Sequence, residues 1–291
     1  MKLKSPFLVQ PGSKLKLADV QTKTHHGVKD EAAAKLLTAK NRDKLEDLQE
    51  KLYATQHKSV LIVLQGMDTA GKDGTIRHIF SGINPQGCNV ASFKVPTSLE
   101  LRHDFLWRCH LQTPPRGMIE IFNRSHYEDV LSPRVHGAID KSTVHERMNA
   151  INDWEKMLAD NGTVVLKFFL HISQKEQTER LQARIDTPSK HWKLSPSDFA
   201  ERLFWDDYQE AYQDLLRQTS KKHAPWFVIP ADHKWYRDMA ISTVLVDALD
   251  GLKMQMPAPE FNPEGLDLKK QKPEKVAQEV KLRAAKASSG K

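Results

Sequence analysis

The sequence predicts an α/β fold: a five-stranded parallel sheet flanked by helices. Two observations lead to this prediction. Short, continuous apolar runs of strand length recur along the chain, and stretches with helical periodicity separate them. Strands that alternate with helices form a parallel sheet, and continuous apolar runs are typical of strands buried on both faces. The five runs are Ser59–Leu64, Val90–Val95, Met118–Phe122, Val164–Leu170 and Trp226–Ile229.

Helices are expected before and between these strands. Residues 30–56, DEAAAKLLTAKNRDKLEDLQEKLYATQ, carry apolar side chains near helical spacing among charges, which predicts an amphipathic helix leading into the core. The other predicted helices are Leu99–Leu111, Thr143–Asp160, Lys175–Ile185 and Pro196–Gln218. The last has a strong start signal, because a capping Ser195 is followed by a proline and an acid in the first turn.

The predicted organisation is a polar N-terminal arm (1–30), one folded domain (31–252) and a flexible basic tail (253–291). Beyond residue 252 the chain is proline-rich and loses its periodicity. Of the formal net charge of +7, residues 1–29 contribute +5 and residues 269–291 contribute +6, which leaves −4 for the body. The basic tail is predicted to be a solvated end, and the alternative is a tether for nucleic acid or polyphosphate.

The composition also excludes several classes of protein. The first 27 residues contain no apolar run of some twenty residues, so neither a spanning helix nor a secretory signal is expected, and a cytoplasmic location without a membrane partner is predicted. The two cysteines, Cys88 and Cys109, match no zinc or redox spacing and are expected to be reduced core thiols.

A glycine-bearing loop, GMDTAGK, follows the first predicted strand directly and precedes the helical stretch TIRHIFSGI. This is the context of a strand-loop-helix phosphate site, in which backbone amides turn inward and a lysine reaches a phosphate oxygen. The predicted phosphate contacts are Gly66, Thr69, Ala70, Gly71, Lys72, Asp73 and Gly74. Asp73 occupies the position where a Ser or Thr usually binds magnesium, which disfavours an ordinary ATPase.

Within this loop, Asp68 is an acid at a position where phosphate oxygens should crowd. Like charges at that range repel unless a cation lies between them, so a magnesium site is implied. Asp68 could instead orient or deprotonate an acceptor phosphate. The structural alternative is a turn residue that bonds its own backbone.

Polar residues follow the third predicted strand in IEIFNRSHYEDVL, at the carboxyl edge where open parallel sheets bind ligands. Asn123 stands where the second nucleotide motif normally ends in Asp. Arg124 could stabilise charge on a transferring phosphoryl group, the alternative being a surface ion pair. Glu128 and Asp129 lie in the same segment.

A lid is predicted at about residues 184–198. The segment ARIDTPSKHWKLSPSDF carries Arg184, Lys190, His191 and Lys193 between two predicted helices. Closure of such a loop over phosphates would exclude water and supply positive charge. The alternative is a solvated loop whose lysines stay in water.

Five blocks together resemble polyphosphate kinase family 2. They are GMDTAGKDG, FNRSHYEDVL, SKHWKLSPSD, WDDYQEAY and APWFVIPADHKWYRD, in that order over roughly residues 58–238. FNRSHYEDVL, with Asn123 in place of the more widespread Asp, resembles the class III subgroup, which is associated with phosphorylation of both AMP and ADP.

The resemblance implies a P-loop kinase fold similar to thymidylate kinase, dependence on Mg²⁺, and reversible phosphoryl transfer from inorganic polyphosphate to AMP and ADP, giving ADP and ATP. It also implies a homo-oligomer, and nucleic acid is not an expected partner. By position, Asp68 would hold magnesium or activate the acceptor, with Asp129 as a further metal contact, and Lys72 and Arg124 would bind the transferring group. The remaining implied phosphate or nucleotide contacts are Glu128, Arg134, Arg184, Lys190 and Lys193.

Two other functions remain open at this point. The phosphate loop alone does not distinguish a triphosphate from a longer chain, so an ATP-dependent kinase for a nucleotide or small metabolite is the nearest alternative. The basic ends alone would also suit a non-catalytic binder of polyphosphate or nucleic acid.

Overall fold

The computed structural model describes residues 5–289 and forms two compact units, one up to Met254 and one from Gln255 onward. The first unit contains the predicted five-stranded sheet. Its strands are β1 (Ser59–Gln65), β2 (Cys88–Ser92), β3 (Ile119–Asn123), β4 (Thr163–His171) and β5 (Trp226–Pro230). Every neighbouring pair is parallel and the order is β2-β3-β1-β4-β5, which confirms the predicted architecture.

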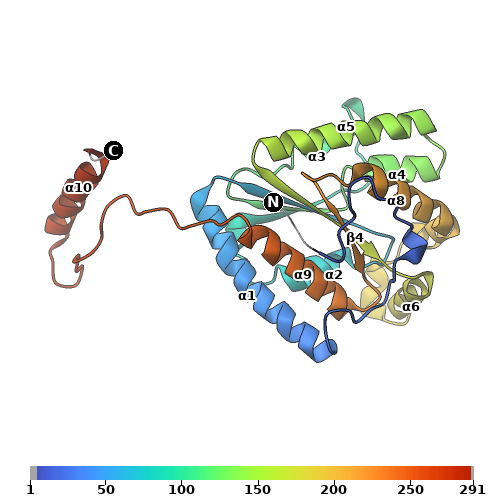
Figure 1. Cartoon of the computed structure of the whole chain (residues 1–291), viewed down its shortest axis with the longest axis horizontal. Helices are drawn as coiled ribbons and strands as arrows, with labels where there is room; N and C mark the ends of the chain where they lie inside the picture. The colour runs from blue at the N-terminus through green and yellow to red at the C-terminus, as the bar shows by residue number, and fades with distance from the viewer. Residues whose placement is uncertain (1–4, 290–291) are drawn as a thin grey trace. The chain divides into compact units, whose positions relative to one another are not determined.

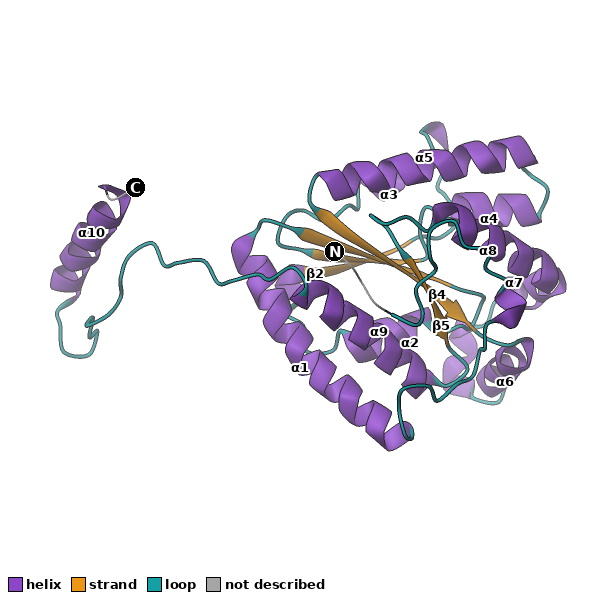
Figure 2. Cartoon of the chain, in the orientation of Figure 1, coloured by secondary structure: helices purple, strands orange, loops and turns teal. Residues whose placement is uncertain are grey.

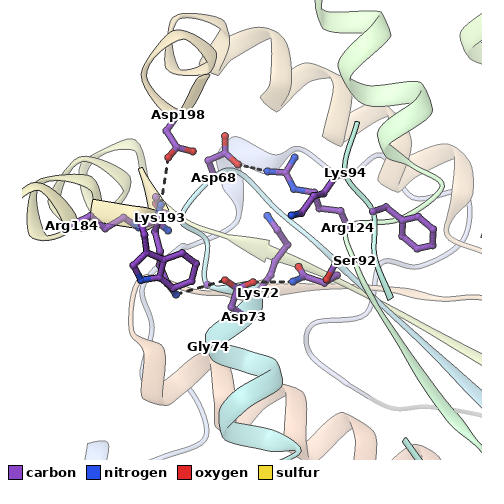
Figure 3. Close-up of a pocket in the computed structure, with 15 residues that line it drawn as sticks. Asp68, Lys72, Asp73, Gly74, Ser92, Lys94, Arg124, Arg184, Lys193 and Asp198 are labelled. Atoms are coloured by element: carbon purple, nitrogen blue, oxygen red, sulfur yellow. Dashed lines mark hydrogen bonds and ion pairs between the residues drawn. The ribbon is translucent and has the colours of Figure 1, made fainter. Parts of the chain in front are cut away.

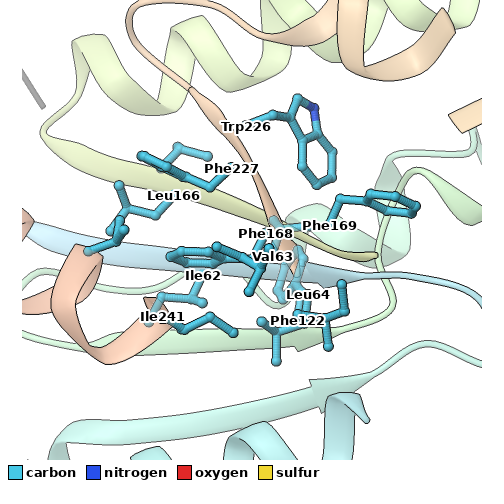
Figure 4. Close-up of a cluster of buried hydrophobic side chains, with 14 of the residues drawn as sticks. Ile62, Val63, Leu64, Phe122, Leu166, Phe168, Phe169, Trp226, Phe227 and Ile241 are labelled. Atoms are coloured by element: carbon cyan, nitrogen blue, oxygen red, sulfur yellow. The ribbon is translucent and has the colours of Figure 1, made fainter. Parts of the chain in front are cut away.

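The central strand β1 shows why its sequence reads as continuously apolar. All seven residues of SVLIVLQ are buried, because helices cover both faces of the sheet and β3 and β4 flank the strand. Around it, Phe168 and Phe227 stack with ring centroids 5.4 Å apart (Figure 4). The register pairs Leu64 with Asn123 on one side, so both strands end at the same edge of the sheet.

The helices form a layer on each face of the sheet (Figures 1 and 2). One layer consists of α1 (Glu31–Thr55), α2 (Lys72–Ile79) and α9 (Lys234–Asp250). The opposite layer consists of α4 (Glu128–Val135), α5 (Lys141–Asp160) and α8 (Trp205–Thr219). The shorter pieces are α3 (Trp107–His110), α6 (Gln174–Ile185), α7 (Pro196–Ala200) and the 3₁₀ turns Leu17–Asp19, Pro85–Gly87, Glu100–Arg102, Pro188–Lys193 and Glu201–Phe204.

Two predicted helices are interrupted. In place of Leu99–Leu111 there is a 3₁₀ turn followed by α3, and the Asp104 side chain accepts a hydrogen bond from the Leu106 amide, a local bond that competes with a helix. The helix predicted over Pro196–Gln218 begins as expected, with Ser195 and Asp198 forming a capping box. A 3₁₀ turn at Glu201–Phe204 then separates α7 from α8.

The N-terminal arm is attached to the edge of the sheet along β5. The Val9 amide donates to the Trp226 carbonyl at 2.9 Å, and the Val228 amide donates to the Phe7 carbonyl at 2.8 Å. Val9 and Leu17 are buried. The arm therefore covers the edge that β5 would otherwise expose, which its polar composition did not indicate.

The second unit, described by itself, contains helix α10 (Pro273–Ser289) within the segment predicted to be a flexible tail. Across residues 5–289, no helix combines the length and the apolar character needed to cross a membrane.

Candidate active site

A cavity of about 510 Å³ lies where the carboxyl ends of the strands meet the loops that follow them (Figure 3). Four separate segments of the chain contribute to its wall: the phosphate loop, the end of β2, the end of β3 and the region 184–198. The lining residues are Asp68, Thr69, Gly71, Lys72, Asp73, Gly74, Ser92, Phe93, Lys94, Asn123, Arg124, Arg184, Trp192, Lys193 and Asp198. The predicted phosphate loop, the polar end of β3 and the predicted lid thus meet around one space.

The glycines of the phosphate loop are required by close packing. Gly71, the N-cap of α2, has φ 105°, and a Cβ there would lie 1.9 Å from Nη1 of Arg237. A Cβ on Gly66 would lie 2.8 Å from the Leu170 carbonyl oxygen. Only glycine fits both positions, and the first residues of α2 line the cavity, the place of the ligand in other helix-terminal anion sites.

The ammonium of Lys72 lies over this loop. Its Nζ donates to the Gly66 carbonyl oxygen at 2.8 Å. Burial, reinforced by the positive charge of Arg124, lowers the pKa of Lys72 to about 8, against the opposing effects of Asp68, Glu128 and Asp73. A bound polyanion would favour the charged form.

The carbonyl groups of the phosphate loop are bound by an arginine that the sequence did not predict. Arg180 on α6 donates from Nη1 to the carbonyls of Thr69 and Ala70, both at 2.9 Å, and from Nη2 to the carbonyls of Ala231 and Asp232. Its Nε pairs with Glu176 on the same helix at 2.7 Å, but the partners through which it holds the loop are backbone oxygens, which no sequence spacing identifies. Arg180 ties the phosphate loop to the end of β5.

Arg124 forms the second charged centre of the cavity. Its backbone adopts φ 62°, an uncommon left-handed conformation for a residue with a side chain. Nη2 lies 2.8 Å from Oδ1 of Asp68, and Nη1 lies 3.4 Å from Oε2 of Glu128. Burial would lower the pKa of Arg124, but these two carboxylates outweigh it and raise the pKa above its ordinary value.

A third contact links the loop to β3 and to the lid. Asn123 donates from Nδ2 to Oδ1 of Asp73 at 2.9 Å, and Nζ of Lys193 lies 3.9 Å from the other Asp73 oxygen. The acid that replaces the usual Ser or Thr in the loop is thus adjacent to the amide that replaces the usual acid on β3. The cavity keeps two loop carboxylates, Asp68 and Asp73.

The predicted lid contributes Arg184, Trp192 and Lys193 to the cavity wall. Arg184 lies 3.7 Å from Asp198, an ion pair within the lid, and the indole of Trp192 is 79% exposed. A large exposed aromatic at the rim of a polar cavity is available to stack on a ligand.

Several predicted contacts lie elsewhere. Asp129 pairs with Arg108 at 2.9 Å, and Arg134 pairs with Asp214 at 2.7 Å on the face of α8. Four further predicted residues are absent from the cavity lining: Gly66, Ala70, Glu128 and Lys190. Gly66 and Ala70 act through the loop backbone, and Glu128 acts on Arg124.

The lining also includes residues that the sequence analysis did not select: Ser92, Phe93, Lys94, Trp192 and Asp198. Ser92 is the last residue of β2, and Phe93 and Lys94 follow it, whereas the predicted strand continued to Val95 and placed all three inside the sheet. The criterion that selected Asn123, a polar side chain at the carboxyl end of a parallel strand, would have selected Ser92 and Lys94 had the strand end been predicted correctly.

The donor set bears on a divalent cation. Within residues 5–289, no group of three or more His, Cys, Asp or Glu side chains is placed to hold a metal ion. Asp68 and Asp129, the predicted pair of metal contacts, are not brought together, since Arg108 pairs with Asp129. One or two carboxylates facing a phosphate site nevertheless suit Mg²⁺, which completes its shell with water and substrate phosphate oxygens.

This arrangement is suited to phosphoryl transfer. The cavity combines helix-terminal amides, two loop carboxylates and the cations Lys72, Lys94 and Arg124. Phosphoryl transfer depends on positioning and on stabilisation of charge on the equatorial oxygens, and it needs no protein nucleophile.

Comparison with known proteins agrees with this chemistry. Residues 28–257 match the family model described as Polyphosphate kinase 2 (PPK2). The chain is 51% identical over 257 residues to the AMP/ADP-polyphosphate phosphotransferase of Meiothermus ruber, covering 87% of this chain and 96% of that protein. It is 44% identical over 270 residues to the ADP-polyphosphate phosphotransferase of Rhodopseudomonas palustris, covering 88% and 93%. The crystal structure of polyphosphate kinase 2 from Arthrobacter aurescens superposes with a TM-score of 0.85 at 43% identity, covering 96% of this chain and 97% of that one.

Proposed function

Since the chain belongs to the polyphosphate kinase 2 family and is a polyphosphate-dependent nucleotide kinase, we propose that it phosphorylates both AMP and ADP, giving ADP and ATP, in a reversible reaction. The names of the relatives support both acceptors. One is named for AMP and ADP together, and others are named for ADP or for AMP alone.

The observation that carries this proposal is the balance of charge in the cavity. Its wall holds five Lys or Arg side chains against three carboxylates, although the body of the chain is acidic. The five cations are Lys72, Lys94, Arg124, Arg184 and Lys193. Two highly charged phosphate compounds that meet at one point require such a local excess, whatever the net charge of the protein.

In the proposed reaction, an oxygen of the acceptor's terminal phosphate attacks the terminal phosphorus of polyphosphate. The bond from that phosphorus to the bridging oxygen breaks, and the shortened polyphosphate leaves with the electron pair. Lys72 and the amides at the start of α2 would hold the donor, and Arg124 would stabilise the transferring group. Asp68, 2.8 Å from Arg124, orients that guanidinium.

We also propose that Mg²⁺ takes part. Asp68 and Asp73, the two loop carboxylates of the cavity, would hold it together with phosphate oxygens. When bound, it would neutralise charge on the phosphates of donor and acceptor. The lid residues Arg184, Trp192 and Lys193 would close over the phosphates and keep water from hydrolysing the donor.

The experiment combines purified protein, polyphosphate and magnesium with either AMP or ADP, without added ATP, and follows the products by chromatography. ATP formed from AMP supports both acceptors. ATP formed from ADP alone would reject AMP as an acceptor. No product would favour an ATP-dependent kinase. Asp68→Asn should reduce transfer by about a hundredfold or more with an unchanged melting temperature, and near-normal turnover in that variant would remove Asp68 from the mechanism.

We further propose a homo-oligomer in the cytoplasm, where nucleotide substrates are found. Within residues 5–289, the edge strand β2 pairs only with β3, and large apolar side chains in and after it are exposed: Val90, Val95, Leu99, Leu101 and Leu111. Open edges and exposed apolar side chains of this kind are typical of protein contacts. Light scattering of the purified chain tests this, and a monomer at micromolar concentration would reject it.

A further inference from the structure

Gln65 is a buried polar residue directly beside the active site, and the proposed reaction gives it no role. It is the last residue of β1, it precedes the phosphate loop, and its exposure is 0%. A buried amide must have partners for both its oxygen and its NH₂ group, because an unpaired polar group in the interior is strongly destabilising. The partners of Gln65 therefore indicate what it does.

Those partners lie on the segment that follows β3. The orientation of the amide follows from its surroundings, since an amide oxygen facing a carboxylate would leave both without a donor. With the oxygen directed at Ser125, it accepts from the backbone amide at 3.2 Å and from the hydroxyl at 3.0 Å. The nitrogen then donates to Oε1 of Glu128 at 3.0 Å. The hydroxyl of buried Tyr212 lies 3.4 Å from the same amide.

Glu128 connects Gln65 to Arg124, because it contacts both side chains. One carboxylate oxygen of Glu128 meets Gln65, and the other lies 3.4 Å from Nη1 of Arg124. Arg124 needs such support, because its backbone is in the left-handed region at φ 62° and its side chain is 43% exposed. Ser125, the other partner of Gln65, is the residue immediately after Arg124.

We propose that Gln65 is a positioning residue that sets the direction of the Arg124 guanidinium, through Glu128 on one side and through the Ser125 backbone on the other. It links the strand that carries the phosphate loop to the segment that carries the arginine. The two halves of the transfer site thereby keep a constant separation. This inference rests on the proposed function, in which Arg124 acts on the transferring phosphoryl group.

The chain of bonds has a polarity that can be reversed. In the native protein, Gln65 donates to Glu128, and Glu128 accepts from both Gln65 and Arg124. Gln65→Glu places two carboxylates against each other, so one must turn away or bind a proton. Combining it with Glu128→Gln restores the pattern, because the new amide can donate to the carboxylate at position 65 and accept from Arg124. The total charge is also unchanged.

The experiment measures kcat and KM of the full chain and these variants with ADP, polyphosphate and magnesium. Gln65→Glu should lower kcat about thirtyfold and change the KM for ADP less than threefold, since Arg124 is assigned to the transferring group. The double variant should recover kcat to within about fivefold of the native chain. A residue with only a structural role would lower the melting temperature and leave the kcat of the folded protein unchanged.

A pH profile adds an independent readout. In Gln65→Glu, a proton shared by the two carboxylates would recreate the missing hydrogen bond, so the kcat deficit should narrow as pH falls from about 8 to about 6. The matched control is Gln49→Glu, which places a carboxylate at another buried glutamine, 2% exposed and in α1. Its kcat should stay within twofold, while melting temperatures show which variants are folded.

The outcomes separate the inference from the function it rests on. No transfer by the native chain overturns the proposed function. An active native chain together with a Gln65→Glu kcat within twofold of normal overturns the positioning role. A double variant no more active than the worse single variant also overturns it, because the paired arrangement is then not what Arg124 requires.

Discussion

Two clusters of charged side chains are built on opposite sides of the same short segment, and they differ in access to solvent. Arg124 turns toward the cavity and pairs with Asp68, at side-chain exposures of 43% and 23%. Two residues later, His126 turns inward, where its Nε2 lies 3.2 Å from Glu155 and both side chains are 0% exposed.

The inner cluster, which consists of His126, Tyr127, Glu155 and Lys167, makes its contacts within the protein. Lys167 of β4 contacts Glu155 at 2.5 Å, the Tyr127 hydroxyl at 2.9 Å and the Thr219 carbonyl at 2.8 Å. Burial alone would raise the pKa of Glu155, but Lys167 and His126 outweigh it and keep the pKa below its ordinary value. Nδ1 of His126 is left without a hydrogen-bond partner, but His126 and Glu155 are 0% exposed, so the cluster is closed to a ligand in the cavity.

The outer cluster, which consists of the charged side chains of the cavity wall, differs in both charge balance and exposure. Its cations outnumber its acids in the cavity wall, and its side chains reach solvent. The same residue types thus stabilise the fold where they are buried and paired, and are available for chemistry where they reach solvent. If that is correct, substitutions in the inner cluster should change stability, and substitutions in the outer cluster should change turnover.

The largest expected effect is in the inner cluster. Lys167→Met leaves Glu155 buried without its main countercharge, which should lower the free energy of unfolding by about 3–5 kcal/mol. Urea unfolding followed by circular dichroism measures it. The control is Lys156→Met, at an ion pair exposed by 58% and 61%, which should change the free energy of unfolding by less than about 0.5 kcal/mol. Equal effects of the two substitutions would contradict the distinction between the clusters.

The next effect is in the outer cluster. Lys72→Met removes a cation from the phosphate loop, which should reduce kcat with ADP by about a hundredfold or more, about 3 kcal/mol of transition-state stabilisation. The melting temperature should stay near that of the native chain. Lys175→Met, at a lysine 85% exposed on α6, is the control for loss of one positive charge. Retained turnover in Lys72→Met would leave the outer cluster without its assigned chemistry.

A smaller effect should appear on changing the pH. Burial lowers the pKa of Lys72 to about 8, so its ammonium is charged below that pH and loses its proton above it. Polyphosphate binds the charged form, and the apparent KM for polyphosphate should therefore rise up to about tenfold between pH 7 and pH 9. The KM of Lys72→Met should lack this rise. A native KM that is constant over the range would show that Lys72 does not provide the charge that binds polyphosphate.

The same contrast explains what could be predicted from the sequence. The phosphate loop was predictable because its parts are adjacent in the sequence. The fourteen residues 59–72 contain the buried strand, the glycine loop and the lysine. The five strands were predictable because burial on both faces makes each run continuously apolar. Helix α9 was not, since twelve of its residues are buried and no periodic face remains to be recognised.

Residues that join the site through the register of the sheet were harder to predict. Ser92 and Asn123 are partners in neighbouring parallel strands, although 31 positions separate them. Arg180 was missed because its contacts with the phosphate loop are made to carbonyl groups, which leave no pattern in the side chains. The polar composition of the N-terminal arm gave no sign that its few apolar residues pair with the edge of β5.

The smallest expected effect concerns Arg134. The family resemblance implies that it contacts phosphate, whereas in the structure it lies outside the cavity. Its guanidinium contacts Asp214 at 2.7 Å and Glu210 at 3.3 Å, so two acids already satisfy its charge outside the cavity. Arg134→Ala should therefore leave kcat within about twofold and lower the free energy of unfolding by about 1 kcal/mol or less. Kinetics of that variant beside Lys193→Ala, at a lysine of the cavity wall, makes the comparison direct. A tenfold loss of turnover in Arg134→Ala would mean that Arg134 leaves its acidic partners to bind substrate. The outer cluster would then include this residue of α4.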